Sequence, residues 1–178
     1  MRRVIVGLMV LGLLAWAGWK FVLEPRRDLG PAAAVDSSGT GYRAVRLFFA
    51  SPTGDRLLSE SRELPESANL HQRVAALVSE LDRGPAGPGV AALPPGTSLL
   101  HVYLDDEGQM TIDLSRAFQQ GFRGGTAAEY MAVSSLVRTL AANIPEVKRV
   151  LIVCGGEPLA SLGGHLPLDR PIDPSEMP

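Results

Sequence analysis

Three residues have the types that a hydrolytic relay needs: Asp113, Ser115 and His165. In such a relay a histidine removes the proton of a serine hydroxyl, and a carboxylate orients the histidine. The residues around Ser115, however, lack the glycine-flanked elbow that exposes a nucleophilic serine. Asp113 and Ser115 end a predicted strand, where such side chains commonly make turn and cap hydrogen bonds. We therefore interpret them as structural and predict no catalytic residues and no enzymatic activity.

A second candidate is an anion site at Gly124-Gly125-Thr126, which precedes a predicted helix. The first amides of a helix have no partner within it and can hold an anion. Thr126 and Glu129, however, have the spacing of a capping box, in which the Thr126 hydroxyl accepts from the Glu129 amide and Glu129 reaches back. Glu129 would also repel an anion. The sequence therefore predicts a structural cap here.

The residue types that bind metals are dispersed. His71 lies on a predicted helix and His101 on a predicted strand, without the spacing of a ligand pair. The turn Asp105-Asp106-Glu107 offers too few ligands for calcium. Cys154, the single cysteine, lies on an apolar strand and is interpreted as a buried, inert thiol. We therefore predict no metal site and no cofactor.

Length and charge restrict the remaining classes of function. The 178 residues suit one ordinary domain with an appendage. The net charge of −2 argues against a nucleic-acid-binding protein, which needs a cationic surface. Residues 44–178 carry 11 basic and 16 acidic side chains, which disfavours anionic partners in general.

The first 23 residues are predicted to target the chain to a membrane. Arg2 and Arg3 precede an uncharged run from Val4 to Trp19, the pattern of an export signal. Apolar residues continue past Lys20, which favours a retained single-span anchor. The pattern Ala15-Trp16-Ala17 leaves a cleaved signal peptide open as the alternative. In either case we expect the rest of the chain to lie outside the cytoplasmic membrane.

Breaker residues and hydrophobic periodicity divide the rest of the chain. Residues 24–43 are rich in proline, glycine, serine and alanine, and predict a flexible linker. Residues 44–172 predict one α+β domain, and residues 173–178 a C-terminal tail. The expected elements are strands over 44–49 and 57–64, a helix over 67–81, strands over 99–104 and 110–114, a helix over 126–144 and a strand over 147–154. This ββαββαβ order predicts a mixed β-sheet with two helices packed on one face.

Several short motifs within this domain coincide in order and spacing. They are Leu81-Asp82-Arg83-Gly84-Pro85, Leu93-Pro94-Pro95-Gly96-Thr97, Ile112-Asp113-Leu114-Ser115, Glu129, Thr139-Leu140, Val150-Leu151-Ile152-Val153, Gly156, Leu162-Gly163-Gly164-His165 and Arg170-Pro171. Together they make residues 44–172 resemble GerMN domains, the sporulation and spore-germination domains of bacterial envelope proteins. The chain departs from the family pattern at Cys154-Gly155, where an acidic residue is usual.

The resemblance implies an extracytoplasmic α+β fold similar to ring-building motifs. Relatives are anchored by a membrane segment or a lipid, and some accompany cell-wall amidase domains. The family implies interaction or assembly and supplies no catalytic residues. We therefore expect a membrane-tethered module that binds an envelope protein or peptidoglycan. The alternatives are a self-assembling protein that forms rings or arrays as a homo-oligomer, and a wall hydrolase or amidase accessory.

Gly163, Gly164 and His165 are the residues that we select for partner contact. They follow the last predicted strand, and glycines permit another backbone to approach closely. The other interpretation is a turn that folds the C-terminal tail back onto the domain.

Overall fold

A computed structural model describes residues 41–177. The predicted membrane segment over residues 1–23 and the part of the predicted linker before residue 41 lie outside the described residues. Within 41–177, every helix is too short or too polar to cross a membrane.

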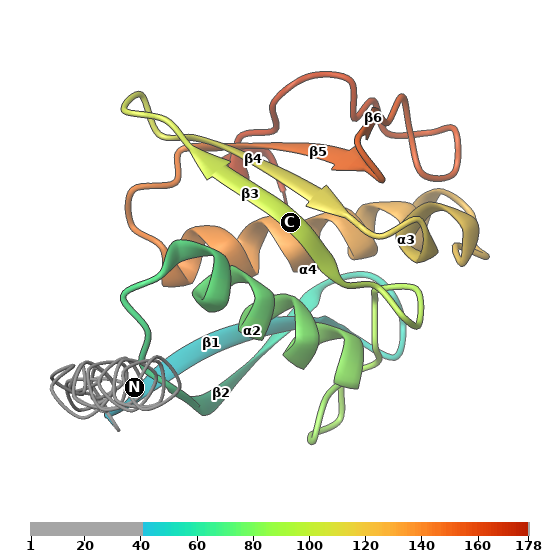
Figure 1. The fold of residues 1–178 in the computed structure, drawn as a ribbon. Coiled ribbons are helices and arrows are strands. Elements are labelled where there is room, and N and C mark those ends of the chain that lie inside the picture. The colour runs from blue at the N-terminus through green and yellow to red at the C-terminus, as the bar shows by residue number, and fades with distance from the viewer. Residues whose placement is uncertain (1–40, 178) are drawn as a thin grey trace, which may run out of the picture. The chain divides into compact units, whose positions relative to one another are not determined.

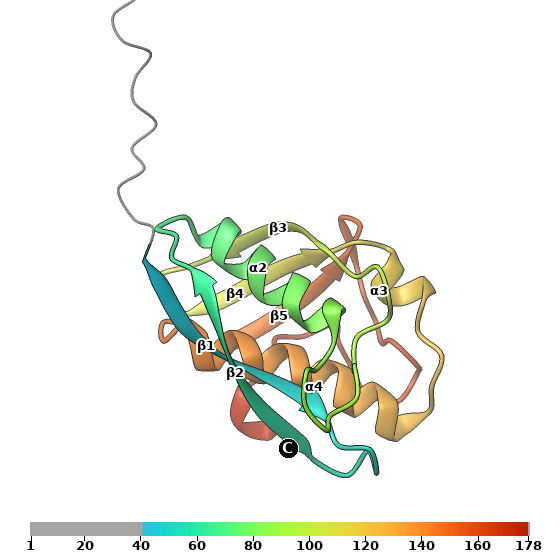
Figure 2. The same ribbon diagram turned by 90° about the horizontal axis from the view of Figure 1, so that it is seen from below.

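The described residues form three layers (Figure 1). A four-stranded sheet forms one outer layer, two long helices the middle layer and a β-hairpin the other outer layer; the view in Figure 2 agrees. The elements are β1 (Tyr42–Ala50), β2 (Leu57–Pro65), α2 (Leu70–Arg83), β3 (Leu99–Leu104), β4 (Gln109–Leu114), α3 (Ala117–Gln120), α4 (Thr126–Asn143), β5 (Arg149–Cys154), β6 (Glu157–Pro158) and a 3-10 turn, η1 (Pro174–Glu176).

The four-stranded sheet is mixed and has the order β3-β4-β5-β6. β4 pairs parallel with β5, and the other two pairs are antiparallel. Alternate residues of β4 and β5 are buried against the helices. These inward residues are Met110, Ile112, Leu114, Val150, Ile152 and Cys154. The prediction of a mixed sheet with two helices on one face is correct for this part of the fold.

The prediction that all strands join one sheet is wrong. β1 and β2 form a separate antiparallel hairpin on the other side of the helices. The physical reason is α4, whose residues from Met131 to Val137 are all buried. A helix that is buried all round needs a covering layer on two sides. The hairpin supplies the second layer.

Three polar residues of α4 bind the backbone of β1. Ser135, Thr139 and Asn143 are four residues apart and therefore lie on one face of the helix. The Ser135 hydroxyl donates to the Phe48 carbonyl, and the Thr139 hydroxyl accepts from the Phe48 amide at 3.1 Å. Asn143 accepts from the Arg46 amide at 2.9 Å and donates to the Arg46 carbonyl at 2.7 Å. Side chains of α4 thus take the place of a neighbouring strand.

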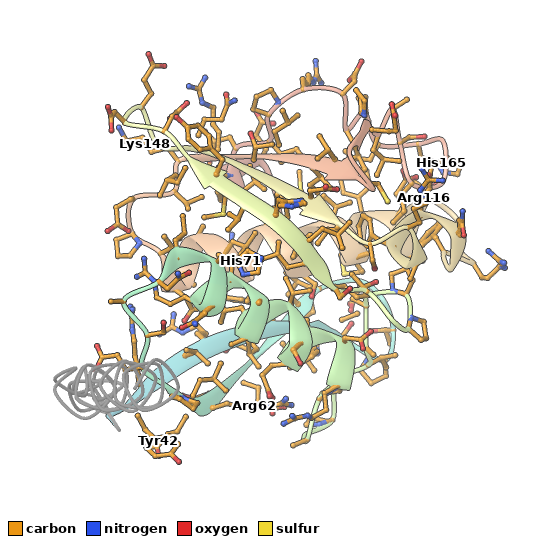
Figure 3. All side chains as sticks on the ribbon, in the orientation of Figure 1. Tyr42, Arg62, His71, Arg116, Lys148 and His165 are labelled. Carbon is orange, nitrogen blue, oxygen red and sulfur yellow. The ribbon has the colours of Figure 1, made fainter. Side chains whose placement is uncertain are left out.

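A charged cluster joins β2 to α2. Arg62 of β2 donates to Glu60 and Glu80, and its Nη2 donates to the Gly84 carbonyl at 2.6 Å. The guanidinium also lies over the Phe49 ring, 5.4 Å from its centre. Figure 3 shows Arg62 near the hairpin and the C-terminal end of α2. The cluster fixes the C-terminal end of α2 against the hairpin.

Thr139→Val tests the contact between α4 and β1. The substitution keeps the shape of the side chain but removes the acceptor of the Phe48 amide. We expect the free energy of unfolding to fall by roughly 1–3 kcal/mol. Thr126→Val is the matched control, since no side-chain cap bond forms at this helix start, and it should change stability by less than about 0.5 kcal/mol. Urea denaturation measures both, and equal effects would contradict the role of Thr139.

Candidate functional site

The loop that carries Gly163, Gly164 and His165 is fastened to a buried carboxylate. Glu129 lies in the first turn of α4 and is fully buried. Its carboxylate accepts from the amides of Leu162 at 2.9 Å, Gly163 at 2.8 Å and His165 at 2.9 Å. The His165 ring atom Nδ1 also lies 3.1 Å from Glu129 Oε2. The loop backbone therefore surrounds the carboxylate with donors.

These donors decide the charge of Glu129. Burial opposes ionisation and by itself would raise the pKa of the carboxyl. The amides of Gly163, His165, Leu162 and Leu166 outweigh that effect and lower the pKa below its ordinary value of 4.5. Glu129 is consequently an anion at neutral pH, held by backbone amides.

Two glycines allow this close approach. A Cβ at Gly163 would lie 2.8 Å from the Phe122 ring and 3.1 Å from Glu129 Oε2. Gly164 has a φ of +91°, a conformation that side-chain-bearing residues rarely adopt. The turn therefore requires both glycines, which accounts for their presence without a partner.

His165 is the member of the loop that reaches solvent. Its side chain is 44% exposed, although its amide and one ring nitrogen face Glu129. Figure 3 shows His165 at the opposite side of the described fold from Tyr42, where β1 begins. The loop can thus present an imidazole edge in a fixed position, and partner contact by Gly163, Gly164 and His165 stays a prediction.

The predicted capping box at Thr126 and Glu129 is wrong. The helix cap is Gly125, and no side chain caps this end. The Glu129 amide donates to the Gly125 carbonyl at 3.0 Å, so it is not available to the Thr126 hydroxyl. The Glu129 side chain binds the loop at Leu162–His165 instead, because that loop offers three backbone amides as donors, whereas a capping box offers one.

The three residues considered for a relay have separate partners. Asp113 lies 3.4 Å from His101 Nδ1 and accepts from the Gly156 amide at 3.0 Å. The Ser115 hydroxyl donates to the Gly96 carbonyl at 3.1 Å and accepts from the Ser98 amide. His165 faces Glu129. The hydrogen bonds of Asp113 and Ser115 are those of a strand end, as their positions in the sequence indicate.

The residues considered for metal binding are likewise apart. His71 Nε2 lies 3.1 Å from the Leu100 carbonyl. Asp105 accepts from the Glu107 and Gln109 amides within its own turn. Over residues 41–177, His, Cys, Asp and Glu nowhere gather in a group of three that could hold a metal ion. Cys154 is buried, and burial raises the pKa of its thiol.

Sequence reasoning missed the anchoring role of Glu129 and the polar face of α4. Two features of the sequence could have identified this role of Glu129: a charged residue next to a nearly continuous apolar run, and the distant glycine pair Gly163-Gly164. Ser135, Thr139 and Asn143 carried the same kind of signal, since three polar residues at helical spacing within a buried helix need partners.

Glu129→Gln tests the anchor through the pH dependence of stability. The neutral amide of glutamine accepts fewer hydrogen bonds than the carboxylate, and its NH₂ group faces the amide donors of the loop. We therefore expect the free energy of unfolding at pH 7 to fall by roughly 2–3 kcal/mol. Because folding lowers the pKa of Glu129, its contribution is fully present above the ordinary value of 4.5 and is lost as the pH falls through the folded pKa. The difference between wild type and variant should therefore shrink on acidification.

Subtracting the stability of Glu129→Gln from that of the wild type at each pH cancels the contributions of the other carboxyl groups. Asp55, whose pKa the hydroxyls of Thr53 and Ser51 lower to about 2, titrates equally in both proteins. Urea denaturation between neutral and acidic pH gives the difference directly. A constant difference across this range would contradict an ionised anchor.

Comparison with known proteins identifies the fold. A family model described as "Sporulation and spore germination" matches residues 46–160. The tandem GerMN domains of the sporulation protein GerM from Bacillus subtilis are similar at 17% identity with a TM-score of 0.63. That match covers 76% of this chain and 48% of the other, so this chain spans about half the length of the tandem protein.

Two other solved structures are similar over most of their length. The first GerMN domain of the same protein has 18% identity and a TM-score of 0.60, over 75% of this chain and 98% of that domain. A putative lipoprotein from Clostridium perfringens has 20% identity and a TM-score of 0.54, over 76% of this chain and 90% of that one. Among curated proteins there is no significant match. The match over residues 46–160 shows that the chain belongs to the sporulation and spore germination family and carries a GerMN domain.

Proposed function

We propose that this protein is a non-enzymatic interaction module of the bacterial cell envelope, tethered to the cytoplasmic membrane and binding an envelope protein or peptidoglycan outside it. The observation that carries the proposal is the combination of a GerMN domain with an export-type N-terminus. Arg2 and Arg3, followed by the uncharged run Val4 to Trp19, supply the membrane segment in the sequence.

Tyr42 begins the first strand, and His165 lies at the opposite side of the described fold. The loop at Leu162–His165 is therefore separate from the surface where the described residues begin. One similar structure is named a putative lipoprotein, a class that is held at membranes. The single cysteine here is Cys154, so this chain would use the apolar segment itself.

The loop also has the physical character of a contact surface. Rigid loops lose little conformational entropy on binding, and the Glu129 contacts make this loop rigid. The exposed imidazole edge of His165 can accept from or donate to a partner. Asp113 and Ser115 are used in strand-end hydrogen bonds, which supports binding rather than catalysis.

Protease treatment of spheroplasts tests the location. We expect external protease to degrade the GerMN domain of the full chain in intact spheroplasts, while a cytoplasmic marker protein stays whole. Cell fractionation should place the undigested protein in the membrane. A domain that is digested only after lysis would contradict the proposed location.

Sedimentation with purified peptidoglycan, followed by photocrosslinking in membranes, tests the contact. A photoreactive residue at His165 should give more adduct than one at Ser79, an exposed control position on α2. His165→Ala keeps the amide that binds Glu129 but removes the ring nitrogen beside that carboxylate, so the melting temperature should fall. Measured at a temperature where both proteins are folded, partner binding should weaken about tenfold. Equal adducts at both positions would contradict contact by this loop.

A further inference from the structure

The two edges of the β1–β2 hairpin differ in accessibility. Ser135, Thr139 and Asn143 of α4 occupy the outer edge of β1 at Arg46 and Phe48. The next outward residue, Ala50, exchanges both backbone hydrogen bonds with Val90. The outer edge of β1 is therefore closed from Arg46 to Ala50.

The outer edge of β2 is open. Ser59 and Ser61 lie opposite Phe48 and Arg46, whose backbone groups face away from the hairpin. In an antiparallel ladder both members of such a pair turn their N–H and C=O groups outward. Ser59, Ser61 and Glu63 accordingly present backbone donors and acceptors along one edge, and all three residues are exposed. No other strand within residues 41–177 pairs with β2.

The sequence of β2 complements itself about Ser61. If a second β2 runs antiparallel with Ser61 opposite Ser61 of its copy, Glu60 faces Arg62, Ser59 faces Glu63 and Leu58 faces Leu64. Glu60 and Arg62, which also bond within each copy, each face the opposite charge, the two leucines face each other, and no like charges are opposed. The outward groups of the three edge residues then form about six hydrogen bonds across the pair.

The two neighbouring registers are worse for electrostatic reasons. A shift by two residues in one direction places Glu60 opposite Glu60 of the copy, and in the other direction Arg62 opposite Arg62. Like charges directly opposite each other destabilise a strand pair. Charge therefore selects the register centred on Ser61.

We propose that β2 is a dimerisation edge, on which a second copy of this chain adds its own β2 antiparallel about a two-fold axis at Ser61. The product is a continuous four-stranded sheet whose outer edges are the two β1 strands. Because α4 and Val90 close those edges, the assembly stops at two copies. The dimer does not depend on the envelope function proposed above. It differs from a ring or array, which needs a head-to-tail interface between two different surfaces of the chain.

Cysteine crosslinking of the full chain in membranes tests the register. In a Cys154→Ala background, Ser61→Cys places two thiols opposite each other in a hydrogen-bonded pair, whose Cα separation of about 5.5 Å suits a disulfide. Mild oxidation should give a covalent dimer at position 61. Ser79→Cys is the matched control, as an exposed serine on α2 away from the proposed pair. Equal dimer from both positions, or a crosslink from position 61 to a different protein, would overturn the proposal.

A proline at the same position tests the backbone pairing. Ser61→Pro removes the outward N–H but leaves the bonds between β1 and β2, whereas Ser61→Ala changes only the side chain. Sedimentation equilibrium of the full chain in density-matched detergent should show a dissociation constant at least about tenfold higher for the proline variant and unchanged for the alanine variant. Dimerisation of Ser61→Pro as strong as wild type would overturn the proposal. If a thermal melt shows that the proline variant is unfolded, the crosslinking yields at positions 61 and 79 decide whether β2 pairs with a second copy.

Discussion

The contact between α4 and the edge of β1 is the interaction on which the described fold depends. Edge strands normally need another strand or solvent to satisfy their backbone groups. Here Ser135, Thr139 and Asn143 satisfy Arg46 and Phe48 from a helix. The contact lets a hairpin cover a helix that already packs on a sheet. It thereby explains why β1 and β2 form a layer of their own and do not extend the four-stranded sheet.

The same helix organises the opposite end of the domain through a different polar group. Glu129, near the start of α4, accepts hydrogen bonds from the amides of the loop before Leu166. Asn143, at the end of α4, binds the backbone of β1. Buried polar groups are costly unless they are fully bonded, so both attachments restrict which loop conformation and which strand position are allowed. α4 thus holds the exposed loop and the hairpin in a fixed relation, which suits a module that works by presenting surfaces.

The sequence predicted most of the elements but not their assembly into layers. Alternating apolar residues predicted β4, a nearly continuous apolar run predicted β5, and the stripe from Leu70 to Leu81 predicted α2. The sequence predicts Ser67 as the cap of α2, but Asn69, two residues later, provides the cap by accepting from the Gln72 amide. The separate hairpin could not be predicted, because pairing of β1 with a helix depends on side chains about ninety residues away. Glu129 was misassigned for the same reason: local spacing indicated a cap, and a distant loop supplied better donors.

Hydrogen exchange of the Arg46 and Phe48 amides is the most direct test of this account. In an isolated hairpin both N–H groups would face solvent and exchange as fast as unprotected peptide amides. In the fold described here Asn143 and Thr139 accept from them, so they should exchange as slowly as the Leu47 amide within the ladder. Residue-resolved NMR exchange on the full chain would measure all three. Rapid exchange at Arg46 and Phe48, with Leu47 protected, would contradict the claim that α4 completes the edge of β1.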